Sequence, residues 1–328
     1  MTERHSSNPD INRREFLSIT ATVTGAWCLN YLKGQTAGAD FKVFLPLVEK
    51  DSHASAFVRG ICYSPYRNGQ NPDTGPHPDE NEFRKDIPLL ASISNAIRLY
   101  GTENNLEKIP GIIQENEPNL KINAGAWLGK DREANERQLS NLVTLVQNYP
   151  GIDSVTVGNE VLLRQDLSEA ELIVYIRRVK DVVACPVTTA ETWWEWKNHR
   201  NLAAEADFVL AHFFPYWEPI PIPINQAVPF VKEKYLELKS KYSDKKIVVG
   251  ETGWPSAGES RGPAVPSVDN QRRFVNELLI WTQTERVDFY YFDAFDENWK
   301  KKYEGEVGGH WGLYYSDRTP KHPGLKFI

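Results

Sequence analysis

Eight short apolar runs, rich in β-branched residues, alternate along most of the chain with segments of helical periodicity. A regular alternation of strand and helix predicts a parallel sheet with right-handed crossovers, and eight unbroken repeats close that sheet. The sequence therefore predicts an α/β fold, a single-domain (β/α)8 or TIM barrel. The expected strands are 57–63, 96–100, 121–127, 152–158, 186–191, 208–212, 247–251 and 287–293.

Several of the intervening segments carry helical patterns with visible start signals. Ser168 followed three residues later by Glu171 is the pair that forms a capping box at a helix start. After the sixth run, alternate prolines within residues 215–223 forbid a helix, so this segment is expected to form an extended loop that walls the mouth of the barrel. The clearest expected helices are 82–92, 132–148, 168–183 and 270–284.

The chain has 328 residues and a formal net charge of −6. A (β/α)8 barrel takes about 250 residues as one unit. We therefore divide the chain into an amino-terminal segment at 1–39, a lead-in at 40–56 and a barrel at 57–328. Charged residues are scattered, which argues against nucleic acid or an anionic membrane surface as a partner. No feature indicates an obligate protein partner.

The amino-terminal segment has the features of an export signal in the expected order. Residues 12–17, Asn-Arg-Arg-Glu-Phe-Leu, resemble a twin-arginine signal, and residues 17–32 carry no charge. Residues 37–39, Ala-Gly-Ala, offer a cleavage site that would start the mature chain at Asp40. We expect a periplasmic or extracellular protein. The alternative is an uncleaved anchor, although the apolar stretch is shorter than the ~20 residues of a spanning helix.

The three cysteines do not form a disulfide framework. Cys28 lies in the export segment. Cys62 falls near the end of the first expected strand and Cys185 at the start of the fifth, so the two side chains lie toward opposite ends of the barrel. We predict that both are free thiols.

Two of the expected strands end in a glycine that is followed closely by a glutamate. Glu160 closes the fourth strand and Glu251 closes the seventh. Because the carboxyl ends of barrel strands open on the same face, both side chains are expected in one mouth. Retaining glycosidases use two carboxyl groups ~5–5.5 Å apart, one as nucleophile and one as acid/base. The pair predicts a glycosidase.

The segments around both glutamates resemble glycoside hydrolase family 17, the β-1,3-glucanase family, in its bacterial-type form. Residues 157–162, Val-Gly-Asn-Glu-Val-Leu, resemble the acid/base segment of that family. Residues 249–256, Val-Gly-Glu-Thr-Gly-Trp-Pro-Ser, resemble its nucleophile segment. The resemblance extends over about residues 57–320 through further matches at 60–63, 97–100, 295–300 and 310–313.

The resemblance implies a retaining β-1,3-glucan hydrolase with Glu251 as nucleophile and Glu160 as acid/base. It also implies that Arg98 keeps Glu251 ionised, that Asn159 binds the sugar 2-hydroxyl, and that Tyr100 orients the nucleophile side. Glu160 needs a raised pKa, which burial would favour. The other candidate substrate-binding residues are Tyr63, Tyr216, Trp254, Glu297 and Trp299.

One motif departs from the family pattern. The usual Tyr-Pro-Tyr after the sixth strand reads Phe214-Pro215-Tyr216, so a phenol that could contact the nucleophile is missing, and Tyr216 is the candidate to replace it. Tryptophans near the expected strand ends are candidate sugar-stacking platforms, with core packing as the alternative for each. These are Trp193, Trp194, Trp254 and Trp299.

Three functions compete on this evidence. The first is a β-1,3-glucan hydrolase, and the second is a β-1,3-glucan transglycosylase that uses the same residues. The third, a non-catalytic glucan-binding barrel, is disfavoured because both glutamates and Asn159 are present. The seven histidines lack metal-ligand spacing and no glycine-rich phosphate loop follows a strand, so we expect no metal and no cofactor. The expected partner is a β-glucan polysaccharide or oligosaccharide.

Overall fold

The computed structural model describes residues 57–327, and its strands form one closed parallel barrel in the order β1 to β8. Each strand pairs with its neighbour in sequence, and β8 pairs with β1. The predicted (β/α)8 barrel and all eight expected strands are confirmed. The strands are β1 (Arg59–Cys62), β2 (Ala96–Arg98), β3 (Lys121–Ala126), β4 (Ile152–Asn159), β5 (Val187–Thr192), β6 (Val209–Phe213), β7 (Ile247–Thr252) and β8 (Phe289–Tyr291).

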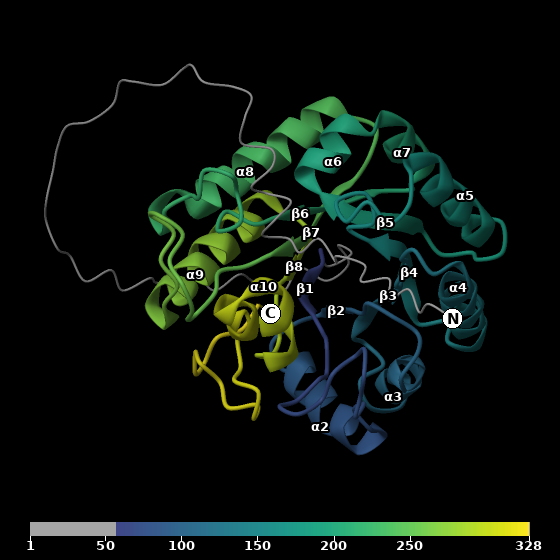
Figure 1. Cartoon of the computed structure of the whole chain (residues 1–328), viewed down its shortest axis with the longest axis horizontal. Coiled ribbons are helices and arrows are strands. Elements are labelled where there is room, and N and C mark those ends of the chain that lie inside the picture. Colours follow the sequence, from purple (N-terminus) through teal and green to yellow (C-terminus); the bar gives the residue numbers. More distant parts are fainter. Residues whose placement is uncertain (1–56, 328) are drawn as a thin grey trace, which may run out of the picture.

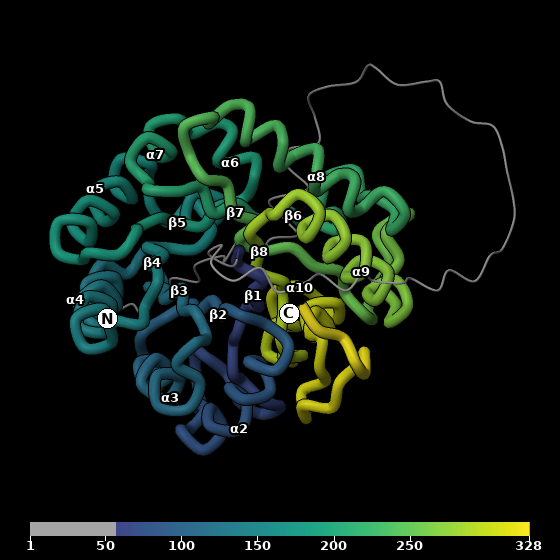
Figure 2. The backbone as a smooth tube through the Cα atoms, turned by 180° about the vertical axis from the view of Figure 1, so that it is seen from behind, coloured from purple at the N-terminus to yellow at the C-terminus, as the bar shows by residue number. Residues whose placement is uncertain are grey.

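The helices form a ring around the barrel (Figure 1), and the view from behind shows the same ring (Figure 2). In both views the carboxyl-terminal segment fills the part of the ring between α9 and α2. The α-helices are α2 (Glu80–Ala91), α3 (Ile109–Asn116), α4 (Arg132–Asn148), α5 (Glu169–Lys180), α6 (Trp193–Asn198), α7 (Arg200–Glu205), α8 (Ile224–Lys241), α9 (Val268–Glu285) and α10 (Lys301–Glu304). Short 3-10 helices are η2 (Leu106–Lys108), η3 (Asn298–Lys300) and η4 (Glu306–His310).

The helix starts follow the signals in the sequence. At α5 the Ser168 hydroxyl accepts the Glu171 amide, and the Glu171 carboxylate accepts the Ser168 amide. The four expected helices are all present, and α4 has the predicted bounds. Helix α8 begins at Ile224, directly after Pro223, so residues 219–223 carry no helix, as predicted.

At the amino-terminal ends of the strands, acidic side chains accept hydrogen bonds from backbone N–H groups of neighbouring segments. Asp153, Asp207 and Asp288 accept the amides of Ile122, Val187 and Val58 at 2.9, 2.7 and 2.8 Å. These bonds satisfy strand-start donors that the barrel ladder leaves open.

Both cysteines in the described residues are free, as predicted. Cys62 ends β1 and Cys185 precedes β5, so they lie at opposite ends of the barrel. The expected export segment at 1–39 and the lead-in at 40–56 lie outside the described residues. Over residues 57–327, no helix combines the length and the apolar character needed to cross a bilayer.

Candidate active site

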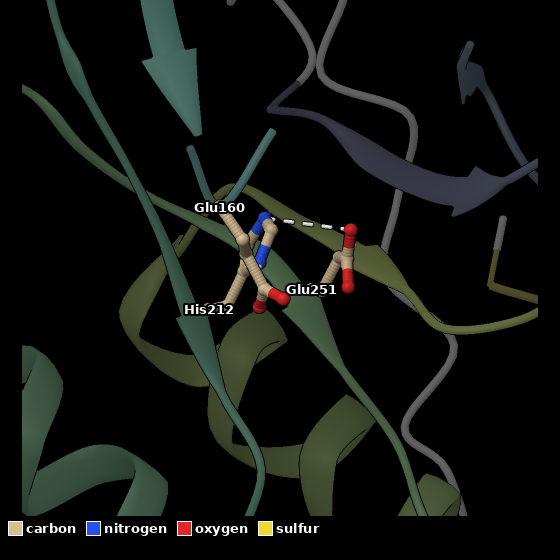
Figure 3. A group of neighbouring side chains, drawn as sticks. All are labelled: Glu160, His212 and Glu251. Carbon is tan, nitrogen blue, oxygen red and sulfur yellow. Dashed lines mark hydrogen bonds and ion pairs between the residues drawn. The ribbon is translucent and has the colours of Figure 1, made fainter. Parts of the chain in front are cut away.

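Three side chains meet at the carboxyl ends of β4, β6 and β7: Glu160, His212 and Glu251 (Figure 3). The His212 ring reaches both acids, with Nδ1 2.8 Å from Glu160 Oε1 and Nε2 3.4 Å from Glu251 Oε1. One oxygen of each carboxylate lies within 4.8 Å of the other. All three are buried, with 8%, 1% and 2% of their surface exposed. The structure therefore brings the two predicted glutamates together.

The turn at the end of β4 sets the direction of Glu160. Gly158 has φ +84° and Glu160 has φ +51°, so two left-handed residues bend the chain there. A Cβ on Gly158 would lie 2.6 Å from the Val161 side chain, which excludes a larger residue. The Glu160 amide donates to the Ala190 carbonyl on β5 at 2.7 Å, which fixes the turn to the barrel.

One oxygen of Glu251 accepts two strong hydrogen bonds from β2 and the residues after it. Arg98 Nη1 donates to Glu251 Oε1 at 2.6 Å, and the Tyr100 hydroxyl donates to the same atom at 3.0 Å. Burial alone would lower the pKa of Arg98, but its neighbours Tyr100 and Glu251 raise that pKa above its ordinary value. A permanent cation is thus paired with the Glu251 side chain, in the position that the family resemblance implies for Arg98.

Asn159 is oriented by the same arginine. Arg98 Nη2 donates to Asn159 Oδ1 at 2.5 Å. Because the amide oxygen is occupied by this donor, the Nδ2 group of Asn159 is the end available to a ligand. Asn159 lines the same cavity as Glu160 and Glu251.

That cavity has a volume of about 550 Å³. Its floor includes both glutamates, and its walls come from the segments after β8, β1, β2, β3 and β4. Among the residues described, none after β5 or β6 lines it. Aromatic rings and polar or charged side chains share the lining, a mixture that can both stack on and hydrogen-bond to a polar ligand. The aromatic lining residues besides Tyr100 are Tyr63, Tyr66, Trp127, Phe292, Trp299 and Tyr303.

Trp299 is held in the cavity wall by a buried acid. Glu297 Oε1 accepts the indole N–H of Trp299 at 2.9 Å and the Ser64 hydroxyl at 2.6 Å, and Lys300 Nζ lies 2.5 Å from Glu297 Oε2. Glu297 itself is 1% exposed and is not part of the lining. Trp299 lines the cavity, where it can contact a ligand as predicted. Glu297 lies outside the cavity and positions the Trp299 and Lys300 side chains.

The structure places two of the expected sugar-binding residues outside the cavity. Tyr216 is 1% exposed and donates its hydroxyl to the Glu259 carbonyl at 2.6 Å. Trp254 is fully buried, stacks on Phe274 and donates its indole N–H to Val265. Both rings point into packing around the barrel rather than into the cavity, so neither can contact a ligand there.

The phenol missing at Phe214 is therefore not supplied by Tyr216. The Tyr100 hydroxyl makes the contact with Glu251 instead, and Phe214 packs edge-on against the His212 ring. Trp193 donates its indole N–H to Glu218 at 2.9 Å. Neither Trp193 nor Trp194 belongs to the cavity lining, so the structure places no stacking platform of theirs inside this cavity.

His212 was missed as a site residue. The signal was its position, because it closes the sixth expected strand just as Glu251 closes the seventh, and the two residues pair across β6 and β7. Trp127 was missed too. It is 43% exposed, with the Arg164 guanidinium 4.3 Å from the ring centre.

Glu160, His212 and Glu251 offer three ligand atoms close enough for a metal ion. The surroundings do not favour one. Arg98 already places a positive charge 2.6 Å from Glu251 Oε1, and a divalent cation bound there would be repelled by it. We assign no metal role to the group.

Comparisons with known proteins agree with this geometry. The BtgE/BtgC glycoside hydrolase domain matches residues 60–312. The glucan 1,3-beta-glucosidase of Schizosaccharomyces pombe is 32% identical over 263 residues, which cover 74% of this chain and 80% of that protein. The probable glucan endo-1,3-beta-glucosidase btgC of Aspergillus fumigatus is 31% identical over 281 residues, but the match spans only 40% of its length.

Solved structures give the same answer. A Rhizomucor miehei glycoside hydrolase family 17 β-1,3-glucanosyltransferase superposes with a TM-score of 0.70 at 28% identity, over 82% of this chain and 96% of that one. An active-site mutant of the Rhizomucor miehei β-1,3-glucanosyltransferase, solved with laminaritriose, gives a TM-score of 0.71 at 27% identity, over 83% and 97%. An endo-laminarinase from Formosa shares the fold, with a TM-score of 0.70 at 20% identity over 83% and 89%. The family 17 resemblance is confirmed.

Proposed function

Because the chain belongs to the BtgE/BtgC glycoside hydrolase family, we propose that it cleaves β-1,3-glucan with net retention of anomeric configuration. The observation that carries this proposal is the pair of carboxylates at the ends of β4 and β7. One oxygen of each lies within 4.8 Å of the other. That spacing suits a retaining enzyme, since an inverting enzyme needs carboxyls ~6.5–9.5 Å apart to hold a water.

In the first step Glu251 is the nucleophile. Arg98, Tyr100 and His212 all approach its Oε1, which leaves Oε2 to attack the anomeric carbon. A bond forms between that carbon and Oε2 while the bond to the leaving oxygen breaks. Glu160 gives its proton to the leaving oxygen. Arg98 Nη1 lies 2.6 Å from Glu251 Oε1, so a fixed positive charge stands beside the nucleophile.

In the second step Glu160, now a carboxylate, takes a proton from the incoming water. The water oxygen bonds to the anomeric carbon and the ester to Glu251 breaks, which returns both acids to their starting states. His212 Nδ1 can partner Glu160 in both states, since an imidazole nitrogen accepts from a carboxylic acid or donates to a carboxylate according to tautomer.

The remaining cavity residues bind the sugar. Asn159 offers its Nδ2 group to the 2-hydroxyl, a bond that strengthens in an oxocarbenium-like transition state. Tyr63 and Trp299 line the cavity and supply aromatic faces or edges to sugar rings. A β-glucan chain or oligosaccharide is the partner that these groups fit.

A second candidate function is transglycosylation, in which a sugar hydroxyl replaces water in the second step. The likeness to the Rhizomucor miehei glucanosyltransferases favours it. Incubation with laminarin and with short laminari-oligosaccharides separates the two. Products that are all shorter than the substrate indicate hydrolysis, whereas products longer than the substrate, formed together with a shorter leaving fragment, indicate transfer. No change in chain length of either substrate would contradict both.

A glucan substrate of this enzyme would lie outside the cytoplasm, so the proposal includes an export role for the amino-terminal segment. Residues 1–39 act as a twin-arginine export signal ahead of the lead-in at 40–56 and the barrel at 57–328. Amino-terminal sequencing of the exported product should begin near Asp40. Intact Met1 in the cytosolic fraction, unchanged when Arg13 and Arg14 become Lys, would contradict this part.

A further inference from the structure

A third carboxyl group lies beside the acid/base turn and has no part in the reaction above. Glu191 is on β5, one residue after Ala190, whose carbonyl accepts the Glu160 amide. We propose that Glu191 is a positioning residue that acts in its neutral form: it anchors the turn that carries Glu160 and so sets the place of the acid/base carboxyl. This inference rests on the proposed function of Glu160.

The anchor is a single hydrogen bond. Glu191 Oε1 accepts the Leu162 amide at 2.9 Å, two residues beyond Glu160. With the Glu160 amide bonded to Ala190, the turn is tied to β5 on both sides of its left-handed residue. A residue at φ +51° needs such support, because this backbone conformation costs energy for any residue with a side chain.

A third bond from β5 strengthens the same attachment. The Thr189 hydroxyl donates to the Gly158 carbonyl at 3.2 Å, at the start of the turn. Residues 189–191 therefore contact the turn at Gly158, Glu160 and Leu162. Of these three contacts, only the one from Glu191 is made by a titratable side chain.

The surroundings of Glu191 favour the neutral acid. The residue is 0% exposed, and its second oxygen, Oε2, is buried without a hydrogen-bond partner in the described part of the chain. A carboxylate in that place would leave a charged oxygen unsolvated, which is more costly than a neutral hydroxyl. The pKa of Glu191 is raised to about 8, chiefly by burial; the bond from Leu162 opposes the rise, and the charge of Glu160 contributes to it.

The charged groups around Glu191 come from two elements. Glu160 and Arg164 follow β4, and Glu195 lies on α6. The two acids favour the neutral form of Glu191, and Arg164 opposes them. A neutral acceptor next to Glu160 holds the turn without adding a second negative charge, which would raise the pKa of Glu160 and hinder transfer of its proton to the leaving oxygen.

Two substitutions test the proposal on laminarin. Glu191→Gln keeps an oxygen that can accept the Leu162 amide and is neutral at every pH. We expect its kcat and the alkaline limb of its pH profile to match those of the wild type. Glu191→Leu removes the acceptor. We expect its kcat to fall about 10–100-fold with little change in KM, the scale of a displaced catalytic group.

The pH profile is the readout that a merely structural residue would not move. If Glu191 were ionised in the active enzyme, Glu191→Gln would remove a negative charge beside Glu160 and lower the pKa of Glu160. The alkaline limb would then shift to lower pH. That shift, or a Glu191→Leu enzyme with wild-type kcat, would overturn the proposal.

Asp207→Leu is the matched control. Asp207 accepts the Val187 amide at 2.7 Å, at the opposite end of the same strand. Its loss should lower the melting temperature without changing kcat. A crystal structure of Glu191→Leu gives a readout that does not need activity, and we expect the Glu160 turn to be displaced from His212. An unmoved turn would contradict the inference, whereas a wild type inactive on laminarin would contradict the proposed function instead.

Discussion

The two ends of the barrel both carry acidic side chains, but they use them differently. At the amino-terminal ends of the strands, Asp153, Asp207 and Asp288 each accept a separate backbone N–H. At the carboxyl-terminal ends, Glu160 and Glu251 are instead connected to each other through His212. The first arrangement satisfies strand-end donors one at a time, and the second couples two acids in one cavity.

The difference shows that an acid at a strand end does not by itself indicate catalysis. The amino-terminal acids are held by backbone groups, and Asp207 and Asp288 also pair with Lys180 and Lys246. The carboxyl-terminal pair is buried, lines a cavity, and shares a cluster with Arg98. A catalytic role is expected where two carboxylates interact with each other and face a cavity. A stabilising role is expected where each carboxylate has its own hydrogen-bond donor.

The largest expected effect is a loss of catalytic activity on substitution of the acids at the carboxyl-terminal end of the barrel, with no such loss at the amino-terminal end. Glu251→Gln and Glu160→Gln should each lower kcat on a β-1,3-glucan by about 10³-fold or more, because neither acid can take over the role of the other. Asp288→Asn is the matched change at the opposite end and should keep kcat within about twofold. Steady-state kinetics together with circular dichroism check this. Comparable losses of kcat in all three variants would contradict the assignment of catalysis to the carboxyl-terminal end of the barrel alone.

A smaller loss is expected from Arg98→Lys. Lysine keeps the charge but not the planar group that donates to both Glu251 and Asn159. A lost bond to a charged group is worth about 1.5–3 kcal/mol, so kcat should fall about 10–100-fold. The test is a comparison of kcat and KM with the wild type. A variant within twofold of wild-type kcat would show that the shared arginine is dispensable.

The next effect concerns stability as a function of pH. Glu191 has a folded-state pKa of about 8 against an ordinary value of 4.5. Between these values the folded state binds more protons than the unfolded state, so stability falls as pH rises. The melting temperature of Glu191→Gln should therefore rise relative to the wild type from pH 4.5 to pH 8. Parallel curves for the two proteins would mean that Glu191 is not held neutral.

The smallest change in activity is expected at the amino-terminal end. Asp288→Ala removes the acceptor of the Val58 amide, which should cost about 1–3 kcal/mol of stability. The melting temperature should drop by several degrees while kcat stays within about twofold. Differential scanning calorimetry and laminarin kinetics measure both. A large loss of kcat without a loss of stability would contradict the structural role assigned to the acids at the amino-terminal end of the barrel.

Much of the fold could be predicted from the sequence because its signals are local. β-Branched runs gave all eight strands, and Ser168 with Glu171 marked the start of α5. The positions of Glu160 and Glu251 followed from strand order, since parallel strands open on one face. Arg98 entered by family resemblance, and its contact with Glu251 was expected.

The orientation of side chains beyond the strand ends could not be predicted in the same way. Tyr216 and Trp254 were expected in the cavity, but both pack into the aromatic cluster around Trp311 and Phe274. Which way a ring turns after a strand depends on packing partners far away in sequence. The role of Glu191 was hidden for the same reason, because its burial and its bond to Leu162 arise only when β4 and β5 pair.

The configuration of the first product tests the central claim most directly. If Glu251 forms a covalent intermediate that water then opens, the two inversions leave the β anomer of the released sugar. Proton NMR of the anomeric signals, recorded in the first minutes of laminarin cleavage, distinguishes the anomers before mutarotation mixes them. The account predicts that the β signal appears first and the α signal grows in later. An α signal that appears first would contradict it.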